Sequence, residues 1–127
     1  MFKHILVPVD GSDTSLAAID KAAGLAKAIG AQVTAIFVID PYPFTGVGAD
    51  FAYGQDQYLN AAKAEAGAAI ENAAARLKQA GVDAETKVVE SHAVWRGVLE
   101  AADAAGADLI VMGSHGRRGL ERLVLGS

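Results

Sequence analysis

The sequence of 127 residues predicts one α/β domain in which helices cover both faces of a doubly wound parallel sheet. Short β-branched runs alternate with long alanine-rich stretches, and each of these stretches ends at a glycine. Alanine is the best helix former and glycine is a common helix stop. The predicted order is therefore β-α-β-α-β-α-β, which implies parallel strands joined by right-handed crossovers.

Apolar residues at spacings of three and four predict the helices, because this spacing places them on one helix face. Three stretches show the pattern before Gly30, Gly81 and Gly106: 13–29, 56–80 and 94–105. Ser12 or Asp13 can cap the first helix, because their side-chain oxygens accept from free N–H groups of the first turn.

Four apolar or β-branched runs predict the strands: 4–9, 32–39, 84–90 and 108–112. The runs "ILVPV" and "LIVM" are nearly continuous, as in strands that are buried on both faces. The fourth strand would lie at or beside an exposed apolar edge, which is a pairing liability that something should cover. We interpret "LERLVLGS" (120–127) as a loop turning into a helix, and expect the fifth strand to be absent because the chain is truncated or has a disordered tail.

One long connection, "DPYPFTGVGADFAYGQ" (40–55), is rich in glycine, proline and aromatic residues. It is predicted to be either a mobile surface loop or a lid near the site.

Composition excludes several classes of protein. The net charge of −4 argues against a nucleic-acid binder, and no apolar run is long enough to cross a membrane. The absence of cysteine excludes disulfides and thiolate metal sites and is compatible with a reducing cytoplasm. Positive charge gathers beside the last glycines, where three arginines accompany one glutamate between Gly113 and Ser127.

Ligands of open α/β sheets bind outside the carboxyl ends of the strands, where the strand order reverses. Gly113 and Gly116 follow the fourth predicted strand, and glycines there let backbone N–H groups converge on a phosphate. A simple turn is the alternative. Asp10 follows the first strand and could accept from an adenine amino group or a ribose hydroxyl, or help to hold a phosphate-bound metal. Its alternative role is a helix cap, but Ser12 and Asp13 are available for that.

Other motifs are missing. The sequence has no G-x-x-x-x-G-K-[ST], no G-x-G-x-x-G after the first strand and no G-x-S-x-G. The three histidines have no metal-ligand spacing. We expect His4 to be structural and His92 to lie at a helix start, whereas His115 is placed to meet a phosphate.

The segment "GSHGRRGLERLVLGS" fits G-x2-G-x9-G-[ST] at Gly113, Gly116, Gly126 and Ser127. With "ADLIVM" before it and the N-terminal "ILVPVDGS", the chain closely resembles the universal stress protein family over almost its whole length. The resemblance implies a Rossmann-like, adenine nucleotide alpha hydrolase-like fold with strand order 3-2-1-4-5. It also implies a cytoplasmic homodimer, often paired through the last strand, that binds ATP alone or with Mg²⁺.

The resemblance also implies site residues. Asp10 would meet adenine and Val38 would pack on the base. The positions around base and ribose are Pro8, Val9, Met112 and Gly113. The positions of the triphosphate loop are His115, Gly116, Gly126 and Ser127. Two features depart from the family: no helix and strand follow Ser127, and "SHAVWRGVLEAA" lacks the glycine that often precedes the third helix.

The predicted function is a nucleotide-responsive stress or regulatory protein that holds ATP without efficient catalysis. No lysine, evident base or metal cluster accompanies the glycines, whereas phosphoryl transfer depends on positioned charges. One alternative is a slow ATPase or phosphohydrolase that uses His115 and Asp10. The other is an interaction module that has lost its ligand and works by dimerisation.

Overall fold

The computed structural model describes residues 2–40, 49–113 and 123–125, and these form one sheet with three helices. The sheet has the order β3-β2-β1-β4-β5, and its first four strands are parallel. The elements are β1 (His4–Pro8), α1 (Asp13–Ile29), β2 (Gln32–Ile39), α2 (Ala49–Gln79), β3 (Ala84–Glu90), α3 (Val94–Ala105), β4 (Leu109–Val111) and β5 (Leu123–Leu125). The predicted α/β class and the order 3-2-1-4 are confirmed.

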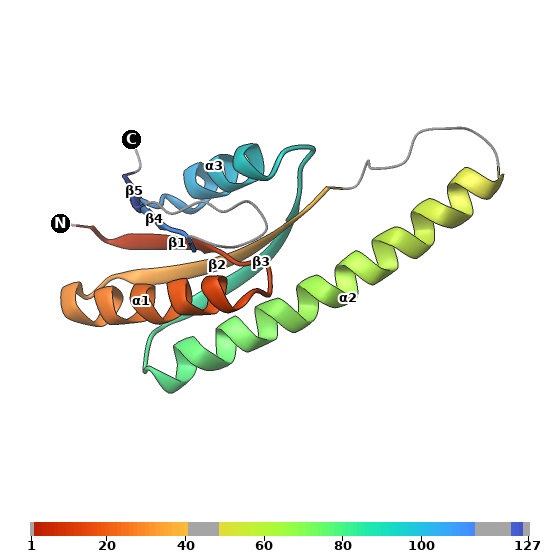
Figure 1. The fold of residues 1–127 in the computed structure, drawn as a ribbon. Helices are drawn as coiled ribbons and strands as arrows, with labels where there is room; N and C mark the ends of the chain where they lie inside the picture. The colour runs from red at the N-terminus through yellow and green to blue at the C-terminus, as the bar shows by residue number, and fades with distance from the viewer. Residues whose placement is uncertain (1, 41–48, 114–122, 126–127) are drawn as a thin grey trace.

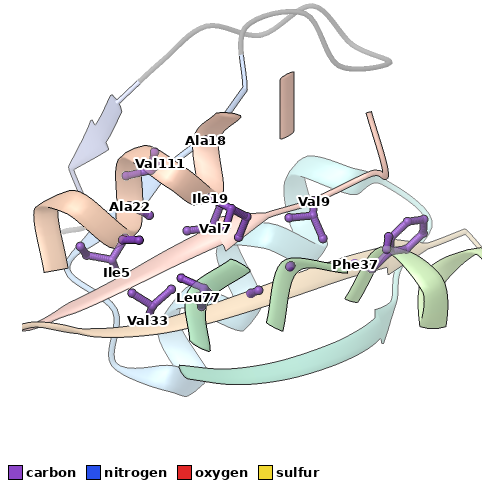
Figure 2. Close-up of a cluster of buried hydrophobic side chains, with 14 of the residues drawn as sticks. Ile5, Val7, Val9, Ala18, Ile19, Ala22, Val33, Phe37, Leu77 and Val111 are labelled. Carbon is purple, nitrogen blue, oxygen red and sulfur yellow. The ribbon is translucent and has the colours of Figure 1, made fainter. Parts of the chain in front are cut away.

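The helices lie on both faces of the sheet, with α1 and α2 on one side and α3 on the other (Figure 1). Successive side chains of a strand point to opposite faces. Ile5 and Val7 of β1 therefore pack in the larger cluster (Figure 2), whereas Leu6 packs in the cluster under α3. Full burial of such a side chain stabilises the fold by about 1.5–3 kcal/mol. Burial on both faces explains why the strand sequence is continuously apolar.

The chain reverses direction across the sheet at β1. From β1 it moves outward through β2 to β3, and then returns to β4 on the other side of β1. Ile5 is in register with both Val33 of β2 and Leu109 of β4. The loops that follow β1 and β4 therefore emerge side by side at the switch point.

The strand β5 corrects the expectation that the chain carries no fifth strand. Residues 123–125, expected to approach a helix, instead pair antiparallel with β4, with Val124 opposite Ile110. A parallel partner needs a crossover of about a dozen residues or more, usually with a helix. A strand that follows β4 so closely pairs in the opposite sense, and it covers the apolar edge that was expected to need protection.

The helix α2 begins earlier than predicted. It starts at Ala49, so the second half of the expected 40–55 connection is helical, while residues 41–48 lie outside the described residues. Residues 49–55 lack a clear three-and-four apolar spacing, but extending an existing helix costs less than nucleating a new one. The Tyr58 hydroxyl donates to the Asp40 carbonyl oxygen at 3.0 Å and ties α2 to the end of β2.

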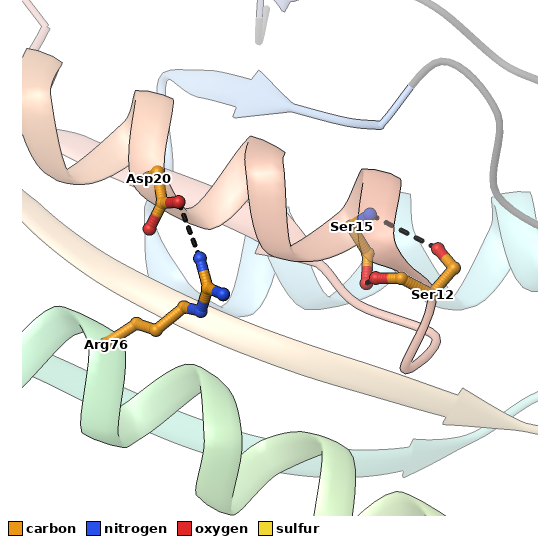
Figure 3. Close-up of polar contacts among 4 residues, drawn as sticks. All are labelled: Ser12, Ser15, Asp20 and Arg76. Atoms are coloured by element: carbon orange, nitrogen blue, oxygen red, sulfur yellow. Dashed lines mark hydrogen bonds and ion pairs between the residues drawn. The ribbon is translucent and has the colours of Figure 1, made fainter.

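The predicted helix ends are confirmed at α1. Ser15 N donates to Ser12 Oγ at 3.2 Å, which makes Ser12 the cap (Figure 3), and Gly30 ends the helix with a φ of 71°. The Arg76–Asp20 pair in the same figure joins α2 to α1 at 2.6 Å, but both side chains are exposed. An exposed pair contributes about 0–1 kcal/mol.

The helix α3 begins without a side-chain cap, because its N-cap is Ala93. His92, expected at a helix start, is exposed and lies just before this position. Trp95 and Leu99 are 60% and 47% exposed on the outer side of α3, and the Arg96 guanidinium lies 5.3 Å from the centre of the Trp95 ring.

Polar contacts fix the amino end of the sheet. The Asp108 carboxylate accepts from the backbone N–H of Lys3 at 3.1 and 3.0 Å and from that of His4 at 3.1 Å. These hydrogen bonds to backbone groups lower the pKa of Asp108 from its usual 3.8. His4 Nε2 lies 2.6 Å from Oγ1 of the fully buried Thr34, in keeping with the structural role expected for His4.

Replacing Gly24 by alanine should stabilise the protein. A methyl group there would have no atom within 4 Å, and a glycine inside a helix costs about 0.5–1 kcal/mol relative to alanine. Chemical denaturation should show that Gly24→Ala raises the free energy of unfolding by about 0.5–1 kcal/mol. Gly30→Ala is the matched control and should lose stability, because its φ of 71° is unfavourable for alanine. A loss for Gly24→Ala would contradict the prediction.

Asp108→Asn should lower stability at neutral pH and have little effect in acid. A lowered pKa in the folded state means that the charged carboxylate stabilises the fold above the unfolded pKa, and that this contribution is lost as the pH falls through the folded value. Urea denaturation should show a difference in the free energy of unfolding between the two proteins at about pH 7, and this difference should narrow once the pH falls below about 4. A difference that is unchanged in acid would show that it does not arise from the charge of Asp108.

Candidate functional site

The candidate site lies at the carboxyl ends of β1, β2 and β4. Six of the ten predicted site residues are described there: Pro8, Val9, Asp10, Val38, Met112 and Gly113. The other four, predicted for the triphosphate loop, lie outside the described residues: His115, Gly116, Gly126 and Ser127. Their roles remain predictions.

The end of β1 is held by its neighbour β2. Pro8, the last residue of the strand, is in register with Ile36, and Val9 N donates to the Ile36 carbonyl oxygen at 2.8 Å. Val9 is 6% exposed and packs in the larger apolar cluster. Both residues therefore determine where the following loop leaves the sheet.

Asp10 is held in a tight turn at the start of α1. Its Oδ1 accepts from Ser12 N at 2.9 Å, and its own N–H donates to Ser15 Oγ at 3.4 Å. Ser15 is 4% exposed, and its hydroxyl also donates to the Ser12 carbonyl oxygen. Gly11, between Asp10 and Ser12, has a φ of 84°, a conformation that glycine adopts readily. Ser12 caps the helix, so Asp10 supports the turn without being the cap.

Gly113 lies against the first turn of α1. A methyl group in place of its hydrogen would lie 2.7 Å from the Thr14 carbonyl oxygen and 3.1 Å from Ser15 N. Such contacts are too close, so only glycine lets the two backbones approach. The sequence predicts that this glycine lets the backbone approach a ligand, and the structure adds that the same glycine packs on α1. The chain just after β4 is therefore held against the start of α1.

Val38 and Met112 contribute an apolar surface on the α3 side of the sheet. Both are partly buried and pack against the cluster that contains Leu6, Ile36 and Ile110. Val38 lies near the end of β2, and Met112 follows β4 directly. The structure thus brings these two predicted residues into one cluster, at the same edge of the sheet as Asp10.

Gly97 of α3 is not among the site residues that the sequence predicts. A methyl group on it would lie 2.9 and 3.2 Å from the two γ-carbons of Val38 and 3.0 Å from Ser91 Cβ. The signal in the sequence was a glycine in the interior of a predicted helix. A glycine at such a position often has a packing reason.

A pocket of 180 Å³ opens at the opposite edge of the sheet, at the amino ends of β1, β2 and β3. Its polar lining includes Asp83 and Glu85 together with His4 and Thr34, which already bond to each other. We therefore place the candidate site at the carboxyl edge, where the strand order reverses.

Among the residues described, no group of three or more His, Cys, Asp or Glu could hold a metal. No helix in the described ranges is long and apolar enough to cross a membrane.

The sequence profile described as the Universal stress protein family matches residues 1–127. A universal stress protein of Methanocaldococcus jannaschii is 38% identical over 127 residues, which cover 100% of this chain and 73% of the relative. Universal stress protein YxiE of Bacillus subtilis is 34% identical over 132 residues, which cover 100% of this chain and 88% of that protein.

Solved structures show the same similarity. The crystal structure of a universal stress protein family member from Burkholderia pseudomallei is 33% identical, with a TM-score of 0.76 over 89% of this chain and 82% of that chain. A universal stress protein in complex with cAMP is 28% identical, with a TM-score of 0.61 over 86% of this chain and 70% of that chain. The fold and the residues at its carboxyl edge define an α/β protein with a candidate ligand site at the switch point. The chain belongs to the universal stress protein family.

Gly113→Ala should destabilise the protein, because the new methyl group would meet the Thr14 carbonyl at 2.7 Å. Overpacking of this kind typically costs about 1–3 kcal/mol. Chemical denaturation should show this loss, whereas Gly67→Ala, which has no atom within 4 Å of its new methyl group, should show none. Equal stability of wild type and Gly113→Ala would show that the contact with α1 is not close.

Proposed function

We propose that this protein binds an adenine nucleotide at the carboxyl edge of its sheet, with ATP, alone or with Mg²⁺, as the nucleotide. One observation carries the proposal: the Gly113 backbone packs on the capped start of α1, beside the turn that holds Asp10. The Asp10 carboxylate and Gly113 thereby lie close together at a switch point, where ligands of such folds bind. The cAMP complex of a 28% identical family member supports a nucleotide as the ligand.

The residues divide into three roles. Asp10 accepts a hydrogen bond from the adenine amino group, and Val38 packs on the base. The positions around the base and the ribose are Pro8, Val9, Met112 and Gly113. The triphosphate is bound through backbone N–H groups and side chains of the remaining four positions: His115, Gly116, Gly126 and Ser127. Glycine-rich backbone and a helix N-terminus suit such an anion because their N–H groups converge on its oxygens.

The protein would act as a nucleotide-responsive regulator of a stress response in the cytoplasm. Occupancy would change the loops after β1 and β4 together, since Gly113 contacts Thr14 directly. A homodimer belongs to the same proposal, and β5 at the end of the strand order is the element through which two sheets would pair. We assign binding without efficient hydrolysis to the protein, because the sequence places no lysine among the glycines of residues 113–127, and phosphoryl transfer depends on positioned charges.

Asp10→Asn should weaken ATP binding while preserving the turn. The amide keeps an oxygen that can accept from Ser12 N but loses the negative charge offered to the adenine amino group. Isothermal titration calorimetry should show roughly tenfold weaker binding, about 1.4 kcal/mol. Asp20→Asn is the matched control on α1: its carboxylate pairs with Arg76 on the surface, so ATP affinity should be unchanged.

Gly116→Val tests the phosphate loop separately and should also weaken ATP binding. Gly113 is unsuitable for this purpose, since any side chain there would also collide with α1. A wild-type protein that binds no ATP, or Asp10→Asn and Gly116→Val variants that bind it as well as the wild type, would refute the proposal.

A further inference from the structure

Gly97 is a glycine without a capping role. It lies inside α3, which begins at Val94 with Ala93 as its N-cap and ends before Gly106. Glycine weakens a helix interior relative to alanine, so its presence calls for a local reason. Gly97 is buried, on the side of α3 that faces the sheet.

The local reason is the close packing of α3 against the end of β2. A methyl group at position 97 would lie 2.9 and 3.2 Å from the Val38 γ-carbons and 3.0 Å from Ser91 Cβ. By contrast, the helical glycines Gly24 and Gly67 have no atom within 4 Å of such a methyl group. Gly97 therefore lies where α3 approaches the sheet so closely that an added methyl group would force a neighbouring group to shift.

The backbone next to Gly97 has little freedom to move away. Val38 belongs to β2, which lies between β1 and β3, and its backbone is in register with Val89. Ser91 N donates to the Ile39 carbonyl oxygen at 2.9 Å, which fixes the chain just after β3. A methyl group on residue 97 would thus rotate the Val38 side chain or lift α3, since the strands themselves are held by their hydrogen bonds.

We propose that Gly97 is a positioning residue that sets base specificity, because it lets α3 press directly on Val38 and so fixes the apolar surface offered to the base. This inference rests on the proposed function, in which Val38 packs on adenine. Gly97 itself does not touch the nucleotide and acts only through Val38. Its effect should therefore fall on recognition of the base and leave the triphosphate contacts unchanged.

The test measures ATP and GTP affinity in four proteins besides the wild type: Gly97→Ala, Val38→Ala, the double variant, and Gly24→Ala as the matched helical control. The wild type should bind ATP more tightly than GTP, whereas Gly97→Ala should bind ATP roughly tenfold more weakly and should lose most of this preference. Gly24→Ala should match the wild type. In the Val38→Ala background, the γ-carbons are gone, and adding Gly97→Ala should cost much less ATP affinity than it does in the wild type.

The outcomes separate this inference from the proposed function. If the wild type binds no ATP, both fail. If the wild type binds ATP and Gly97→Ala binds it equally well, only the inference fails. It also fails if Gly97→Ala weakens ATP and GTP by the same factor, or if its effect is the same with Val38 and with alanine at position 38, because either result indicates a general structural role.

If the Gly97→Ala variant does not fold, a measurement on the wild type tests the same inference. Nuclear Overhauser contacts between the Gly97 α-protons and the Val38 methyl groups should persist when ATP is bound, and the Val38 methyl resonances should shift. Loss of those contacts, or methyl resonances that ATP leaves unchanged, would overturn the inference.

Discussion

Burial of β1 on both faces of the sheet is the constraint on which the other elements depend. Ile5, Leu6 and Val7 are each 0% exposed, so helices must cover both sides and strands must flank both edges. The helices α1 and α2 cover one face, and α3 covers the other. Because β2 and β4 lie on opposite sides of β1, the strand order reverses there, and the site residues gather around the carboxyl end of β1.

Two different kinds of force hold the two halves of that site. The turn at Asp10 depends on directional hydrogen bonds with Ser12 and Ser15, which fix the orientation of a carboxylate. The apolar half depends on contact, since Val38 is positioned by the close approach of α3 at Gly97. A polar substitution and a steric substitution should therefore disturb separate parts of ligand recognition.

Local signals predicted the elements that local forces determine. The bounds of α1 and α3, and those of β2 and β3, agree with the predicted 13–29, 94–105, 32–39 and 84–90. The start of α2 was missed because residues 49–55 carry no clear periodicity. The strand β5 was missed because it has only three residues, within a segment that was interpreted as a loop turning into a helix. For Gly113, the motif indicated that glycine is needed, but only the folded chain shows that Thr14 is what it approaches. Gly97 gave a weaker signal for the same reason: its contact with Val38 exists only after α3 has packed on the sheet.

The exposed indole of Trp95 gives the protein a built-in optical reporter. The sequence contains one tryptophan, so all indole fluorescence arises from this position, two residues before Gly97 on α3. Trp95 is 60% exposed and the centre of its ring lies 5.3 Å from the Arg96 guanidinium, an environment in which a small displacement changes both hydration and the nearby charge. The emission spectrum of the unlabelled chain should therefore follow the seating of α3 on β2.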